Sequence, residues 1–169
     1  MHPYRKFALI MAVSFVVMHA VMYLNTYAWD HVTVSLVSEM RFYMTCLMIL
    51  AMMVTMLLMM RSMYEDAAKN RGIIAFAVIG FAIVLYLVRG QPFVQDKSWM
   101  KSMIPHHSIA ILTSERAEIS DVRVKQLAEE IIEAQRREIA EMKWLLEDIR
   151  SNGEVTTAAQ LPGREVPAF

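Results

Sequence analysis

Residues 96–113, DKSWMKSMIPHHSIAILT, decide how the rest of the chain is interpreted. On a helix, Met103 neighbours both His106 and His107, because it precedes them by three and four residues. Steps of four, three and four residues also align a carboxylate, two thioethers and an imidazole along one helical face: Asp96, Met100, Met103 and His107. These residues therefore predict a candidate metal site on one side of the helix.

The chemistry of these side chains favours a late first-row metal. Imidazole suits several such ions, whereas thioether points to copper and above all to Cu(I). The alternative is that the methionines fill gaps in a helix–helix core and that the histidines form a polar pair at its edge. Spacing alone leaves both interpretations open.

The composition of the whole chain indicates a membrane protein. Of its 169 residues, 56% are hydrophobic, the mean hydropathy is +0.35, and the apolar residues come in blocks. The formal net charge is zero, so no overall field favours nucleic acid, and we expect no nucleic-acid partner. Cys46 is the single cysteine, which excludes an intrachain disulfide.

Apolar runs bounded by basic residues predict three membrane spans, at about residues 7–28, 42–60 and 73–88. A helix needs about 20 residues to cross the hydrocarbon core, and the shortest run can span with snorkelling ends. Basic residues concentrate before the first run and between the second and third. By the positive-inside rule the N-terminus is then cytoplasmic and the chain after Arg89 lies in the periplasm of a bacterial cell. Arg89, Lys97 and Lys101 count against this orientation, because they lie on the outer side.

After residue 92 the composition changes to a charged, periodic pattern that predicts a helical hairpin. Asp96 is expected to cap a helix that passes through the histidines, and Ser120-Asp121 to cap a second helix from Val122 to Arg150. The predicted division is a three-span membrane domain, a hairpin metal-binding domain and a flexible tail: residues 1–92, 93–150 and 151–169. The fold class expected is therefore an all-α membrane protein with an extracytoplasmic α-hairpin.

The second helix of the hairpin carries an apolar stripe that Gln135 and Glu138 interrupt, close to Met142. A polar pair in such a stripe destabilises the packing unless it is hydrogen-bonded or binds a ligand. Antiparallel pairing about a turn near residue 120 puts Gln135 and His107 at the same distance, about 21 Å from the turn. The same count puts Glu138 and Met142 level with the part of the first helix that precedes His107.

A hairpin of this length buries too little apolar surface to be secure alone. Two hairpins from two chains make a four-helix bundle with metal-capable side chains facing inward. We therefore expect a homo-oligomer or a larger membrane complex.

Two separated motifs resemble the domain of unknown function 305 family. The segment FVQDKSWMKSMIPHHSIAIL contains its M-I-P-H-H motif at residues 103–107, and IIEAQRREIAEMKWLLEDI contains its Q-x-x-E-I-x-x-M motif at residues 135–142. The membrane half, with TYAWDHV and a methionine-rich second span, looks like a subgroup that carries three spans before this domain.

The resemblance implies a ferritin-like helical half bundle, completed by oligomerisation, and a periplasmic copper-binding role known among some secreted relatives. The ligands that it implies are Met103, His106, His107 and Met142, with Met100, Asp96 and Glu138 as weaker candidates. The chain departs from these relatives in having one short hairpin behind a membrane anchor. It also has Ser108 where they usually have glutamine.

The membrane half offers a candidate second site. His19 lies within the first span between Met18 and Met22, and an ionisable residue there is a functional candidate by default. The alternative is that the imidazole of His19 forms a hydrogen bond with a backbone carbonyl. Counted from the outer interface by helical rise, His19 and Met48 lie at similar depths and could be neighbours if the two spans pack together. Methionines recur every fourth residue from 40 to 56, so the row turns by about 40° around the helix at each step. These methionines are interpreted either as a path for copper through the membrane or as adaptable packing against lipid or a partner helix.

The loop between the first two spans contains Asp30 and His31, followed by Glu39 and Met40. These residues are interpreted either as an accessory metal site near the outer face or, more plainly, as an Asp–His hydrogen bond.

Together these observations predict a membrane-anchored periplasmic metal-binding protein, most of all for copper, acting in tolerance, storage or delivery. The alternative is a structural or assembly subunit of a larger membrane complex without a metal role. Catalysis is not expected, because a ferritin-like oxidase uses several Glu-x-x-His arrangements and this hairpin contains none. Nor does any arrangement of serine, cysteine or lysine indicate nucleophilic chemistry.

Overall fold

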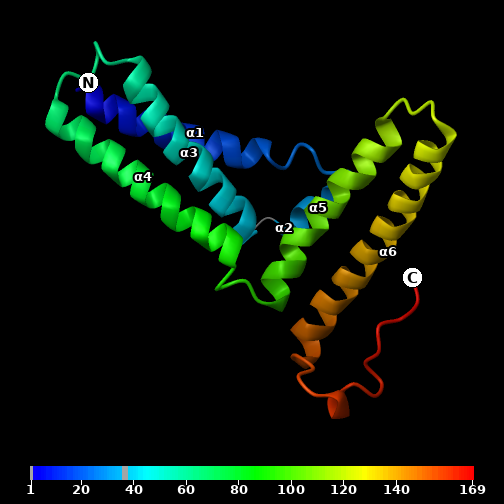
Figure 1. Ribbon diagram of the computed structural model, residues 1–169. Coiled ribbons are helices and arrows are strands. Elements are labelled where there is room, and N and C mark those ends of the chain that lie inside the picture. Colours follow the sequence, from blue (N-terminus) through cyan, green and yellow to red (C-terminus); the bar gives the residue numbers. More distant parts are fainter. Residues whose placement is uncertain (1, 36–37) are drawn as a thin grey trace. The chain divides into compact units, whose positions relative to one another are not determined.

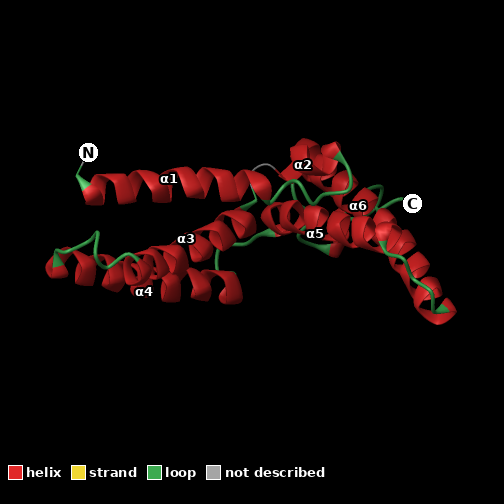
Figure 2. Ribbon diagram, turned by 90° about the horizontal axis from the view of Figure 1, so that it is seen from above, coloured by secondary structure: helices red, strands yellow, loops and turns green. Residues whose placement is uncertain are grey.

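The computed structural model describes residues 2–35 and 38–169, and every regular element in these ranges is helical (Figure 2). In chain order the elements are α1 (Pro3–Val21), α2 (Trp29–Ser35), α3 (Glu39–Met59), α4 (Ala67–Gly90), α5 (Asp96–Arg116), α6 (Val122–Asn152) and the 3₁₀ helix η1 (Ala158–Gln160). The expected all-α fold class is confirmed. The chain forms two compact units: one holds α1, α3 and α4, and the other holds α2, α5, α6 and the C-terminal segment.

The first unit contains the three helices that are long and apolar enough to cross a membrane, namely α1, α3 and α4. They correspond to the three predicted spans but differ in their ends. Helix α1 ends at Val21 rather than near residue 28, and the chain after it turns toward α2. Helix α4 begins at Ala67, ahead of its apolar run, because the side chain of Asp66 accepts hydrogen bonds from the first-turn amides.

Helix α3 packs against both α1 and α4 in this unit (Figure 1). The buried cluster consists of Phe7, Met11, Ile49, Leu57 and Tyr64. The later members of the methionine row, Met52 and Met56, pack against this cluster, whereas Met44 and Met48 are exposed. The row therefore drifts around α3, as its spacing predicts, and its later members contribute to packing within the unit.

Polar contacts join the end of α1 to the start of α3. The guanidinium of Arg41 donates to the backbone carbonyl of Met22 and lies 4.3 Å from the ring centroid of Tyr23. A cation there satisfies a carbonyl left free at the end of a helix. His19 Nδ1 lies 3.1 Å from Thr45 Oγ1, so its hydrogen-bond partner is a hydroxyl and not the backbone carbonyl expected from the sequence.

In the second unit, α5 and α6 form the predicted antiparallel hairpin (Figure 1). Asp121 caps α6 as expected, since its side chain accepts from the amide of Arg123. Asp96 does not cap α5: it is the first helical residue, and the preceding Gln95 makes no side-chain cap. Pro105 lies inside α5 without ending it.

The C-terminal segment, predicted from the sequence as a flexible tail, makes polar contacts with the end of α6. Arg164 Nε lies 3.1 Å from Asp148 Oδ2, and the same guanidinium donates to the carbonyl of Gly153. Gly153 has φ +79°, which turns the chain back after α6 in a conformation that glycine adopts without strain. A charge-assisted, multidentate contact therefore ties the chain as far as Arg164 to the end of α6.

A first prediction concerns the approach of α3 and α4. A Cβ atom at Gly80 lies 3.3 Å from Cδ2 of Leu50, so we expect Gly80→Leu to overpack this contact and to destabilise the unit by about 1–3 kcal/mol. The apparent free energy of unfolding from an SDS titration in mixed micelles measures the effect. Gly72→Leu is the matched control, because the Cβ position there has no described atom within 4 Å; equal effects of the two substitutions contradict the packing.

Candidate functional site

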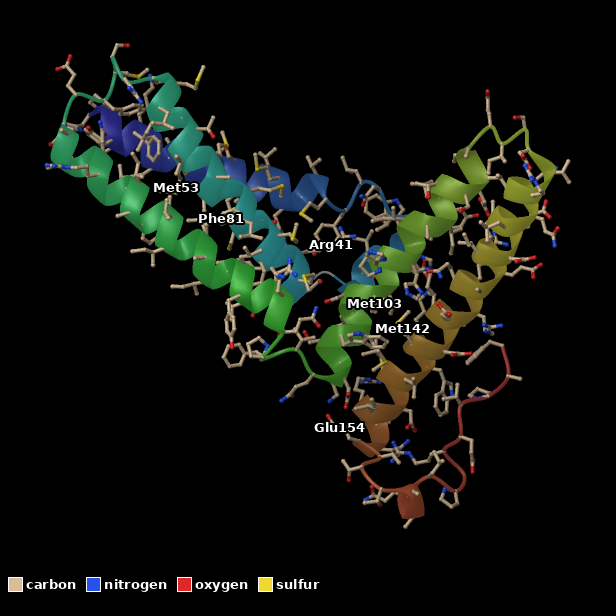
Figure 3. All side chains as sticks on the ribbon, viewed as in Figure 1. Arg41, Met53, Phe81, Met103, Met142 and Glu154 are labelled. Atoms are coloured by element: carbon tan, nitrogen blue, oxygen red, sulfur yellow. The ribbon has the colours of Figure 1, made fainter. Side chains whose placement is uncertain are left out.

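The interface between α5 and α6 is an apolar core that contains methionine from both helices (Figure 3). Met100 of α5 is 3% exposed and Met142 of α6 is 5% exposed, and both belong to a cluster with three isoleucines: Ile104, Ile111 and Ile139. Met103 is half-buried and packs against the same cluster. The hairpin thus brings together all three of the thioethers that the sequence selected.

His107 lies beside an acidic residue of the facing helix. Its Nδ1 lies 3.1 Å from Oε2 of Glu138, but the angles are not those of a hydrogen bond. The nitrogen is buried and has no hydrogen-bond partner among the residues that the structure describes. Burial lowers the pKa of His107, Glu138 raises it, and His106 lowers it further, for a net shift downward.

Two of the predicted ligands stand apart from this group. His106 is exposed, because neighbouring residues on a helix point about 100° apart, and its ring centroid lies 6.5 Å from that of His107. Asp96 is exposed in the first turn of α5. The structure therefore places Met100, Met103 and Met142 in one cluster, pairs His107 with Glu138, and leaves His106 and Asp96 at the surface.

The pairing of the two helices differs by about one turn from the register counted from the sequence. Glu138 rather than Gln135 meets His107, while Gln135 Nε2 lies 3.4 Å from Oε2 of the same glutamate. The sequence count took equal numbers of residues on either side of residue 121. Helix α5 already ends at Arg116, so that count pairs His107 with the wrong residue of α6. The predicted contact between the interrupted stripe and the histidines is present for His107 alone.

The oxygen and nitrogen donors of the hairpin do not form a metal site by themselves. Within residues 2–35 and 38–169, no group of three or more His, Cys, Asp or Glu side chains is arranged to hold a metal ion.

Sequence reasoning missed a third helix in this unit. The stretch from Asn25 through α2 belongs with the hairpin, although the sequence division at residue 92 assigns it to the membrane domain. Ser108, which is completely buried, accepts a hydrogen bond from the amide of Tyr27 at 2.7 Å. Its hydroxyl also lies 2.9 Å from Nδ1 of the buried His31. One side chain of α5 therefore holds the backbone and a ring of the α2 segment.

Charged contacts reinforce this attachment. Asp30 pairs with Lys143 of α6, and the guanidinium of Arg136 lies 5.9 Å from the ring centroid of Tyr27. The hydrogen bond from Lys143 lowers the pKa of Asp30. Asp30 Oδ1 lies 3.9 Å from Nε2 of His31, beyond hydrogen-bond distance, so the Asp–His hydrogen bond expected from the sequence is replaced by contacts of each residue with the hairpin.

A sequence signal for this attachment existed. Ser108 lies among apolar residues on α5, and a hydroxyl buried there needs a partner. The sequence does not say which distant residue supplies that partner, because the contacts to residues 27 and 31 join positions 81 and 77 residues apart.

We expect Ser108→Ala to destabilise the second unit by about 1–3 kcal/mol, because it leaves the amide of Tyr27 and Nδ1 of His31 without their partner. The three tryptophans of the chain, at positions 29, 99 and 144, all lie in this unit, so a urea titration followed by tryptophan fluorescence reports on it. Ser114→Ala on the same helix is the control. Equal stability of the two variants would falsify the attachment.

The stability of this unit is also expected to depend on pH. Burial lowers the pKa of His31 below the ordinary 6.5, Lys143 lowers it further, and Asp30 opposes the shift. The unfolded chain therefore binds the proton more readily, so stability is constant above about pH 6.5 and falls below it, by at most about 1.4 kcal/mol per pH unit for each such histidine.

His107, whose pKa is also lowered, contributes in the same direction. Urea midpoints at pH 7.5 and 5.5 measure the dependence, and His31→Gln should reduce it. A dependence that is the same in the variant and the parent contradicts the assignment to His31.

Comparison with known proteins gives two matches. The family described as a domain of unknown function (DUF305) matches residues 89–165, which include α5, α6 and Arg164 of the tail contact. An uncharacterized protein of Acanthamoeba polyphaga mimivirus is 38% identical over 116 residues, which cover 68% of this chain and 74% of that protein. No solved structure matches the chain significantly.

Proposed function

This chain belongs to the DUF305 family, and from that premise we propose that it is a membrane-anchored metal-binding protein that holds Cu(I) in the α5–α6 hairpin. Three helices are long and apolar enough to anchor it in a bilayer. The role that follows is tolerance, storage or delivery of copper. The proposal assigns no catalytic step to the protein.

The observation that carries the proposal is the unsatisfied ring nitrogen of His107. Its Nδ1 is buried, faces Oε2 of Glu138 at 3.1 Å, and has no hydrogen-bond partner among the described residues. A buried polar atom without a partner is costly, and ligation of a cation is one way to offset that cost. Burial also keeps His107 neutral to lower pH, which is the form that binds a metal.

The donor set favours Cu(I) over harder ions. Met103 and Met142 lie in the same cluster, and thioether prefers Cu(I) to Zn²⁺ or Mg²⁺. We assign His107, Met103 and Met142 as the ligands, with Met100 and Glu138 beside them. Packing alone accounts for the burial of the methionines. The buried Nδ1 of His107 is therefore the feature that distinguishes a metal site from an ordinary apolar core.

The proposed orientation places the N-terminus in the cytoplasm and the hairpin in the periplasm of a bacterial inner membrane. The basic residues before the first span and between the second and third support it. We also propose that a second copy completes a four-helix bundle. The start of α6 exposes apolar side chains that a second copy would cover: Val122, Val124 and Leu127.

We expect His107→Ala combined with Met142→Leu to weaken Cu(I) binding at least tenfold, because it removes an imidazole and a thioether while it preserves the apolar volume at residue 142. Titration of the full chain in detergent under reducing conditions, against a chromophoric Cu(I) chelator, measures the affinity. Met59→Leu is the matched control, since this methionine is 80% exposed on α3. His106→Ala alone should have the smaller effect.

Undiminished Cu(I) affinity in the double variant overturns the site. Copurification of metal-free protein with a large membrane complex would instead support the role of an assembly subunit.

A further inference from the structure

A cavity in the unit of α2, α5 and α6 has four basic side chains among its seven lining residues. Its volume is about 330 Å³. Its lining, called the basic pocket from here on, consists of Val34, Lys97, Lys101, Lys143, Leu146, Glu147 and Arg150. The residues proposed as copper ligands do not line it, so it is a separate feature of the hairpin.

Two of the four cations in the basic pocket are free to bind an anion. Lys143 pairs with Asp30, and Arg150 pairs with Glu147. Lys97 and Lys101 form no ion pair with any residue that the structure describes, and they lie one turn apart on α5. With both carboxylates counted, the charges at the pocket still sum to an excess of two positive charges.

The rest of the lining indicates a ligand with an apolar part. Val34 of α2 and Leu146 of α6 supply apolar surface beside the ammonium groups. The connection from α4 to this unit is short, because α4 ends at Gly90 and α5 begins at Asp96. At no more than about 3.6 Å per residue, Lys97 stays within roughly 25 Å of the end of a membrane-spanning helix.

We propose that the basic pocket binds the phosphate headgroup of an anionic phospholipid, with Lys97 and Lys101 as its main contacts. The phosphate forms ion pairs with the ammonium groups of Lys97 and Lys101, and the start of the acyl region packs against Val34 and Leu146. Each basic residue near an anionic lipid surface contributes measurably to binding, and this attraction falls with salt. The proposal also gives a role to the two lysines that oppose the positive-inside count, and it does not depend on copper.

The test uses the full chain in nanodiscs of phosphatidylcholine that contain a small fraction of phosphatidylglycerol. Native mass spectrometry of the released protein counts the phosphatidylglycerol molecules that remain bound. We expect Lys97→Gln with Lys101→Gln to reduce this retention on the order of tenfold. The control, Arg116→Gln with Lys125→Gln, removes the same charge from exposed positions of the same unit outside the pocket, and should retain the lipid.

A second arm separates the lipid from a free anion. Glycerol phosphate and inorganic phosphate, added at millimolar concentration, should displace the retained lipid only weakly, because they lack the apolar contact. Retention that is equal in the pocket variant and the control overturns the proposal. Complete displacement by free phosphate assigns the pocket to a soluble phosphate ligand and overturns the lipid assignment.

Discussion

The buried hydroxyl of Ser108 is the contact on which the second unit depends. It accepts the amide of Tyr27 and meets the ring of His31, so it joins α2 to a helix far along the chain. Without it, the amide of Tyr27 and Nδ1 of His31 would both lose this hydroxyl, and the loss of a hydrogen-bond partner inside a protein costs more than the loss of an ordinary surface contact. The hairpin is thereby a three-helix unit, with a larger core than the two helices alone provide, although the family match includes only α5, α6 and part of the tail.

Much of the fold follows from the sequence because periodicity and caps are local signals. Apolar length identified three spanning helices, and Asp121 marked the start of α6. The attachment of α2 was not predicted, because a hydrogen bond over 77 residues leaves no local pattern. The contact of Arg164 with Asp148 was not predicted either. It depends on one charged pair, and it lies in a segment whose glycine and proline residues show no periodic pattern.

The candidate site shows the same division between local and distant information. Spacing placed three methionines on facing helices, and the structure groups them. Spacing also linked His106 with His107, yet successive helical residues diverge, so only His107 turns toward Glu138. Met100, Met103 and His107 thus lie on the side of α5 that meets α6. A count from the turn could not give the register, because α5 ends before the turn that the count assumed.

The bond between α2 and α5 also constrains how the chain threads through a membrane. Tyr27 precedes α3 and Ser108 follows α4, and a hydrogen bond can form only between segments on the same side of a bilayer. In a chain that crosses a membrane, the number of crossings between them must therefore be even, and α3 and α4 are two helices long and apolar enough to make those crossings. A chain in which only one of these two helices crossed the membrane would leave Tyr27 and Ser108 in different compartments, so this hydrogen bond requires that both helices cross the membrane or that neither does.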